Sequence, residues 1–251
     1  MLKLRILPVL LYKNPTLVKG ISFDSWRRVG SVMQAIKVYN MREVDELIFV
    51  DITASQENRR PDFELIDEIA DECFMPFTVG GGVKTIDDIR ELLKVGADKV
   101  SINSSAVTSP ELITIASDKF GAQCIVVSID YKRINGKDEV YINSGNVATG
   151  LDLINWARKV EKLGAGEILL TSIDRDGTMS GYDVETLKKV TEAVNIPIIA
   201  SGGCGNYSHM LECVITGSAS AIAAASIFHF TEQTPKEAKA FLSAHGIPVR
   251  L

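Results

Sequence analysis

The chain repeats itself at an interval of 121 residues. Val44–Ile48 resembles Ala165–Leu169, and Met75–Gly82 resembles Ile196–Gly203, with the same offset in both pairs. Each copy takes up about half of the 251-residue chain. A repeat of this length predicts two half-barrels closed on one another.

Short apolar, β-branched runs alternate with amphipathic segments of helix length. The predicted strands are Arg5–Leu11, Glu46–Asp51, Phe77–Gly80, Lys99–Ile102, Ile125–Asp130, Glu167–Thr171, Ile198–Ser201 and Ala221–Ala225. Helical spacing is found in Asp62–Cys73, Thr85–Val95, Pro110–Lys119, Leu151–Leu163, Val184–Val194 and Tyr207–Thr216. This pattern predicts an α/β fold, a closed (β/α)8 TIM barrel, and the repeat favours it over an open doubly wound sheet. We expect one domain over residues 1–251, with half-barrels of about 1–120 and 121–251.

Composition excludes several classes of protein. Lys and Arg number 27 against 32 Asp and Glu, so the net charge of −5 gives no basic surplus for nucleic acid or an anionic membrane. No stretch reaches the roughly 18 apolar residues of a membrane-spanning helix. The four cysteines form no C-x-x-C pair, and the N-terminus does not resemble a signal peptide. We therefore expect a cytoplasmic protein with free thiols.

Two polar, glycine-containing stretches are expected to be irregular loops. Lys13–Gly30 follows the first strand and Arg133–Gly150 follows the fifth, so the two loops occupy equivalent places in the two halves. The site of a (β/α)8 barrel lies at the C-terminal ends of its strands. We expect the two loops to cover that face.

Each half ends its third strand in glycines and its fourth in small or polar residues. These are Gly80-Gly81-Gly82 with Asn103-Ser104-Ser105, and Gly202-Gly203 with Ala224-Ala225-Ser226. Glycine lets backbone N–H groups approach an anion, and the N-terminus of the following helix adds partial positive charge. The duplication predicts a substrate with a phosphate at each end, although such glycines can also serve only tight turns.

Carboxylates stand at the same ends of the strands. Asp51 and Asp130 end strands two and five, and Asp174 and Asp176 follow strand six. A carboxylate aimed into the barrel mouth is a candidate general acid or base. Asp176 could equally form a turn with Gly177, and Asp130 could cap the next loop.

Four charged residues open strands at the opposite end of the barrel. They are Arg5, Glu46, Lys99 and Glu167, on strands one, two, four and six. Each alone could be a solvated surface residue. Together their alternating charges predict a ring of ion pairs that plugs the base of the barrel, yet is polar enough to pass a small polar molecule.

The remaining polar and aromatic candidates carry no signal for a cofactor. The histidines share no metal-ligand spacing, and they are His209, His229 and His245. Trp26 and Trp156 are explained by packing. We predict neither a metal nor a cofactor.

Several long segments carry a family resemblance: Leu47–Ser55, Thr78–Gly82, Ala97–Asn103, Gly166–Gly177 and Ala225–Phe230. They are similar to the HisF family, the cyclase subunits of imidazole glycerol phosphate synthase, and the similarity extends over essentially the whole chain. The resemblance implies a (β/α)8 barrel that receives ammonia from a HisH-like glutaminase docked at its base. In the family, ammonia reacts with a bis-phosphorylated ribulosyl formimino aminoimidazole carboxamide to give imidazole glycerol phosphate and an aminoimidazole carboxamide ribotide.

The resemblance also assigns roles to individual positions. Phosphate-binding positions of the family match Gly82, Asn103, Ser104, Asp176, Gly177, Gly203, Ala225 and Ser226. Other active-face positions match Lys19, Asp51, Ser144 and Thr171. The gate of the ammonia conduit matches Arg5, Glu46, Lys99 and Glu167, and the glutaminase-docking face matches Asp98 and Gln123. Asp130 matches one of two catalytic aspartates.

The second catalytic aspartate is replaced by Leu11. The first strand of the family ends in Cys-Leu-Asp-Val-Lys, where this chain has Val9-Leu10-Leu11-Tyr12-Lys13. Leucine cannot transfer a proton, and losing one positioned acid/base group typically costs about 10²–10⁴-fold in rate. The loop that follows also departs, since the family's Lys-Asp-Gly-Arg is Lys13-Asn14-Pro15-Thr16 here.

Three functions follow from this departure. The chain is expected to resemble HisF-like paralogues that pass ammonia from a glutaminase to an N-acetyl sugar amidotransferase in surface-saccharide biosynthesis. Alternatively it is an authentic cyclase of histidine biosynthesis, or a non-catalytic scaffold for the glutaminase. In each case its expected partners include the glutaminase and a small phosphorylated ligand, but neither nucleic acid nor a membrane.

Overall fold

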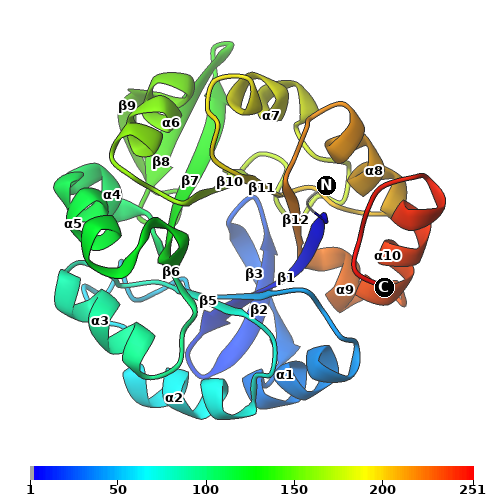
Figure 1. Cartoon of the computed structure of the whole chain (residues 1–251), viewed down its shortest axis with the longest axis horizontal. Helices are drawn as coiled ribbons and strands as arrows, with labels where there is room; N and C mark the ends of the chain where they lie inside the picture. The colour runs from blue at the N-terminus through cyan, green and yellow to red at the C-terminus, as the bar shows by residue number, and fades with distance from the viewer. Residues whose placement is uncertain (1–2) are drawn as a thin grey trace.

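Eight parallel strands form a closed ring in the computed structural model, which describes residues 3–251 (Figure 1). β1 (Arg5–Lys13) pairs with β4 (Leu47–Asp51) on one side and β12 (Ala221–Ala224) on the other, which closes the ring. The other barrel strands follow in order from β4: β5 (Phe77–Gly80), β6 (Lys99–Ile102), β7 (Ile125–Ile134), β10 (Glu167–Ser172) and β11 (Ile198–Ser201). The predicted (β/α)8 barrel is confirmed.

Helices surround the barrel (Figure 1). They are α1 (Val32–Met41), α2 (Phe63–Glu72), α3 (Ile86–Lys94), α4 (Ser104–Thr108), α5 (Glu111–Phe120), α6 (Leu153–Lys162), α7 (Val184–Thr191), α8 (Tyr207–Ile215), α9 (Ser226–Phe230) and α10 (Pro235–Ala244), with a 3-10 turn at Ala122–Cys124. Asp62, Asp152 and Asp183 begin α2, α6 and α7 by accepting backbone N–H groups of the first turn. Within residues 3–251, no helix has the length and apolarity needed to cross a bilayer.

Two β-hairpin units stand where the sequence predicted irregular loops. β1 continues beyond the barrel and pairs antiparallel with β2 (Thr16–Ile21), which pairs with β3 (Asp24–Gly30). β7 likewise continues into β8 (Lys137–Ile142) and β9 (Val147–Asp152). The loop prediction for residues 13–30 and 133–150 is therefore wrong. The long barrel strands supply free edges for pairing, and residues with positive φ reverse the chain sharply at the hairpin tips.

The barrel interior has three levels, because side chains alternate between its two faces along each strand. In β1, Arg5 lies at the strand start, Leu7 belongs to a buried apolar cluster in the middle, and Leu11 lines the opposite mouth. The middle cluster consists of Leu7, Ile48, Val126, Leu169, Ile199, Ala221 and Ala223. A separate, larger core packs the strands against the helices.

Candidate functional site

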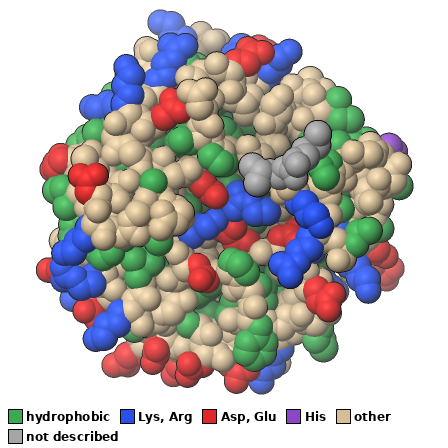
Figure 2. Space-filling view, in the orientation of Figure 1, with side chains coloured by type: hydrophobic (Ala, Val, Ile, Leu, Met, Phe, Trp, Pro, Cys, Tyr) green, Lys and Arg blue, Asp and Glu red, His purple; other side chains and the backbone are tan. Residues whose placement is uncertain are grey.

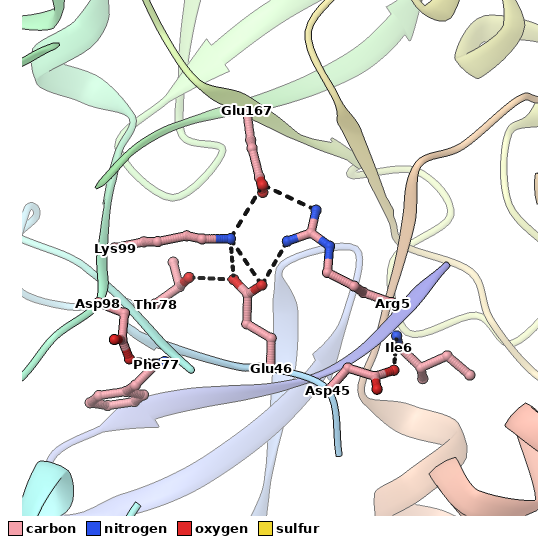
Figure 3. A network of polar contacts seen from close by, with 9 residues as sticks. All are labelled: Arg5, Ile6, Asp45, Glu46, Phe77, Thr78, Asp98, Lys99 and Glu167. Atoms are coloured by element: carbon pink, nitrogen blue, oxygen red, sulfur yellow. Dashed lines mark hydrogen bonds and ion pairs between the residues drawn. The ribbon is translucent and has the colours of Figure 1, made fainter. Parts of the chain in front are cut away.

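The four charged residues at the strand starts form a closed ring of ion pairs (Figure 3). Arg5 lies 2.7 Å from Glu46 and 3.1 Å from Glu167, measured from guanidinium nitrogen to carboxylate oxygen. The Lys99 Nζ lies 2.9 Å from Glu46 Oε2 and 3.2 Å from Glu167 Oε1. Each cation therefore contacts both anions, in the alternating arrangement that their sequence positions predict.

The two anions of the ring are held differently. Glu46 is only 2% exposed, and a third residue, Thr78, donates a hydrogen bond from its hydroxyl to it at 2.8 Å. Glu167 receives both cations on Oε1, while its Oε2 is buried without a hydrogen-bond partner. Burial alone would lower the pKa of Arg5, but the carboxylates of Glu167 and Glu46 outweigh it and raise this pKa. The ring thus closes the barrel base with balanced charges and one free acceptor.

The surface around this end of the barrel is both charged and apolar. Lys, Arg, Asp and Glu side chains gather near the barrel axis in Figure 2. Asp98 and Gln123 are exposed, the first directly before β6 and the second in the 3-10 turn before β7. Asp98 also accepts the Phe77 N–H at 2.8 Å. Two large apolar side chains that the sequence analysis missed are exposed nearby, Met41 at 79% and Phe74 at 84%.

An open pocket occupies the other end of the barrel. Every active-face position that the family resemblance assigns lines it: Leu11, Lys19, Asp51, Gly82, Asn103, Ser104, Asp130, Ser144, Thr171, Asp176, Gly177, Gly203, Ala225 and Ser226. Asp174 does not line it, and its carboxylate instead accepts the Arg133 N–H at 2.9 Å. Residues from both halves of the sequence therefore meet in one pocket, at the strand ends where the sequence analysis expected them.

Asp130 has the environment of a group that exchanges protons near neutral pH. Burial, and secondly the negative charge of Asp176, raise the pKa of Asp130 to about 7. Hydrogen bonds from Thr171, Ser128 and Asn103 oppose this shift, and the Asn103 amide lies 3.1 Å from Asp130 Oδ2. The carboxyl can therefore serve as a general acid or base.

The other two acids that line the pocket are already paired. Asp176 lies 2.5 Å from the buried Lys19 ammonium. Asp51 accepts the N–H groups of Thr53 and Ala54, and Arg59 lies 3.1 Å from its second oxygen. Asp51 is thus fixed to its own loop, and Leu11 places no acid in this part of the pocket.

Apolar and aromatic side chains form the opposite wall of the pocket. Val9, Leu11 and Val50 come from β1 and β4. Phe23 and Trp26 come from the β2–β3 hairpin, and Phe23 also packs against Gly145 of the other hairpin. Trp26, which the sequence analysis explained by packing, also lines this wall. The signal that could have found both aromatic residues was their place in a segment predicted to cover the active face.

The glycine turns use backbone conformations that favour glycine and leave little space for a side chain. Gly81, Gly82, Gly202 and Gly203 all have positive φ. A Cβ at Gly203 would lie 2.1 Å from the Gly181 carbonyl oxygen, so close packing alone requires glycine there. The turns could therefore accommodate an anion, but close packing is sufficient to explain their glycines.

No group of three or more His, Cys, Asp or Glu side chains suited to a metal occurs among residues 3–251. His229 is half-buried, desolvation lowers its pKa to about 4, and its Nε2 lies 3.3 Å from the Val9 carbonyl oxygen. A neutral imidazole at this place donates to the strand that carries Leu11.

Comparison with known families gives a match over most of the chain. The model of the family described as "Histidine biosynthesis protein" matches residues 5–234. The matched span includes all eight barrel strands, the charged ring, both glycine turns and the residues that line the pocket.

Proposed function

The chain belongs to the family of histidine biosynthesis proteins, and within it we propose that this barrel is the HisF-like subunit of a glutamine amidotransferase complex. A HisH-like glutaminase docks at the strand-start end and releases ammonia there. The ammonia passes through the barrel to the pocket. An N-acetyl sugar amidotransferase then uses it to amidate a sugar in surface-polysaccharide biosynthesis.

The observation that carries this proposal is a complete charged ring combined with an incomplete acid/base pair. All four ring residues contact their neighbours, whereas the pocket has Asp130 but Leu11 in place of a second acid. Closing an imidazole ring requires proton transfers at several atoms, for which one positioned carboxyl is a poor substitute for two. Passing ammonia requires none of them.

The charged ring contains a hydrogen-bond acceptor that ammonia could use as it enters the barrel. The buried Glu167 Oε2 has no partner and can accept an N–H. Thr78 contacts the ring, and Ser101 and Ser128 line the pocket above it, so hydroxyl groups lie along β5, β6 and β7. Such groups replace the hydration that a small polar molecule loses inside the barrel.

The surface of the strand-start end suits a protein partner. Asp98 and Gln123 supply polar groups at the predicted docking positions. Met41 and Phe74 lie near one another, since Asn40 of α1 accepts the Phe74 N–H at 3.1 Å. Exposed apolar side chains rimmed by polar ones are typical of protein interfaces.

Isotope transfer in the reconstituted complex tests the proposal. Glutamine labelled with nitrogen-15 in its amide is supplied with excess unlabelled ammonium chloride, and the label in the amidated sugar is measured. Channelled transfer keeps the label high in the wild type. Lys99→Ala should lower it toward the level in bulk, with glutaminase binding unchanged in sedimentation velocity. Lys94→Ala, at an exposed lysine, is the matched control.

The second candidate is the cyclase of histidine biosynthesis, converting ammonia and the bis-phosphorylated formimino carboxamide ribotide. The observation that favours it is Asp130, whose pKa of about 7 suits acid/base catalysis. The scaffold alternative requires neither the ring nor the pocket. It would be supported if Lys99→Ala left the label in the product unchanged.

A further inference from the structure

The starts of β1 and β4, which carry Arg5 and Glu46 of the charged ring, lie outside the ladder that joins these two strands. Among residues 3–251, the register between the strands begins only at Val9 and Ile48. Pro8, directly before it, has no N–H to donate. The backbone ladder therefore does not hold Arg5 against Glu46, and another support is needed there.

The side chain of Asp45 supplies this support. Its Oδ2 accepts the Ile6 N–H at 2.9 Å (Figure 3). Ile6 directly follows Arg5, and Asp45 directly precedes Glu46. One hydrogen bond from the backbone to a side chain thus joins the strand starts, where the Arg5 guanidinium lies 2.7 Å from the Glu46 carboxylate.

Asp45 is held in turn by Lys239 of α10. The Lys239 Nζ lies 2.9 Å from Asp45 Oδ1 and donates to the Glu43 carbonyl oxygen, also at 2.9 Å. The two charged side chains are only 6% and 5% exposed. Asp45 Oδ1 has no hydrogen bond within the described part of the chain, so the charge of Lys239 is what stabilises it. Removing Lys239 would leave the carboxylate buried without a counter-charge.

The second half of the chain joins the equivalent strands without such a pair. β7 and β10 pair at Val126 and Glu167, which stand 121 residues after the two ring residues on β1 and β4. Gly166 takes the place of Asp45. A half-barrel of this kind therefore closes without a carboxylate at this position. The buried pair occurs in the half where a ring cation and a ring anion must meet.

We propose that Asp45 and Lys239 are positioning residues of the charged ring, and that the contact between Arg5 and Glu46 depends on their buried pair. Lys239 fixes the Asp45 carboxylate, and this carboxylate fixes the start of β1 through Ile6. The α10 helix thereby determines how firmly the base of the barrel is closed. The inference rests on the proposed function only in treating the ring as the entry for ammonia.

A thermodynamic cycle tests the positioning directly. The coupling between Arg5→Ala and Glu46→Ala is measured by urea denaturation in the wild type and in Asp45→Ala/Lys239→Met, which leaves no buried charge unpaired. The coupling should weaken about tenfold, as a ratio of unfolding constants, because Ile6 is no longer held. Asp45→Asn/Lys239→Met keeps an oxygen that can accept the Ile6 N–H, so its coupling should weaken less than about threefold.

Two further variants keep the cycle decisive. Asp88→Ala/Arg60→Met removes another buried aspartate with its arginine partner and should leave the coupling within about twofold of the wild type. Lys239→Gln, which removes only one charge, should weaken it about threefold and replaces Asp45→Ala/Lys239→Met if that variant does not fold. An unchanged coupling would overturn the proposal, as would an equal loss in Asp45→Asn/Lys239→Met or in the Asp88 control.

Nitrogen-15 transfer in the reconstituted complex tests the consequence for ammonia. Asp45→Ala/Lys239→Met should lower the label in the amidated sugar toward the level in bulk. Glutaminase binding should be unchanged in sedimentation velocity, because both residues are buried. A wild type that itself loses the label would contradict the proposed function, while the cycle would still test the pair. A variant that retains the label as well as a channelling wild type would overturn the role of the pair.

Discussion

The two ends of the barrel differ in how completely they match the residues expected there from the family resemblance. At the strand starts, all four charged residues form one closed ring, and Glu46 and Lys99 each contact two oppositely charged partners. At the strand ends, Asp130 faces a wall in which Leu11 takes the place of the second acid. This difference supports the proposed function, in which ammonia enters through the ring and is not used for cyclisation in the pocket.

Removing an anion from the charged ring should give the largest loss in the free energy of unfolding. Glu46→Ala leaves Arg5, Lys99 and Thr78 without their shared acceptor. Breaking a buried ion pair in this way typically costs about 3–5 kcal/mol of the free energy of unfolding, measured by urea denaturation.

A surface pair supplies the control for that measurement. Glu91→Ala removes the exposed partner of Lys94 and should change the free energy of unfolding by less than about 0.5 kcal/mol. Equal losses in Glu46→Ala and Glu91→Ala would show that the ring is an ordinary set of surface charges.

At the opposite end of the barrel, the raised pKa of Asp130 makes the free energy of unfolding depend on pH. The folded protein retains this proton up to about pH 7, whereas the unfolded chain loses it near pH 3.8. The buried carboxyl therefore lowers stability as pH rises from 4 to 8. Asp130→Asn should gain about 2–4 kcal/mol relative to the wild type over that range, in urea denaturation at each pH. A difference independent of pH would contradict the assigned environment.

Introducing an acid at position 11 should give the pocket the cyclase activity that the proposed function says it lacks. Leu11→Asp is expected to raise ammonia-dependent formation of imidazole glycerol phosphate about 100-fold above the wild-type background, because a second positioned carboxyl becomes available. Leu11→Asn has a similar shape but cannot transfer a proton, so it should remain at background. If both variants were equally inactive, the lost activity would have to be assigned to the altered hairpin instead.

The smallest effect concerns Thr78, the third residue that donates to Glu46. Thr78→Val removes the hydroxyl at 2.8 Å but keeps the shape of the side chain. We expect a loss of about 1 kcal/mol in the free energy of unfolding, the usual value of one hydrogen bond. Thr108→Val, at an exposed threonine of α4, should change it by less. No loss in Thr78→Val would show that the ion pairs alone fix Glu46.

The sequence predicted the barrel and the residues of both ends because strand periodicity decides which side chains face inward. Arg5, Leu7 and Leu11 illustrate this, since residues two or four apart on β1 share the interior. The hairpins were missed because their pairing depends on how far β1 and β7 extend beyond the barrel. The sequence also could not predict how the two serines that begin α4 and α9 differ. The Ser104 hydroxyl accepts the Asn143 N–H, whereas the buried Ser226 hydroxyl has no hydrogen-bond partner among residues 3–251. The difference depends on a partner distant in sequence.

The most direct test of the central claim is turnover by the wild-type chain supplied with ammonium chloride and the bis-phosphorylated formimino carboxamide substrate of the family. Release of imidazole glycerol phosphate is followed by proton NMR. A barrel that passes ammonia without cyclising this substrate should form no product above the uncatalysed background. Turnover at about one per second or faster, within the usual range for enzymes, would contradict the account and identify the chain as a cyclase.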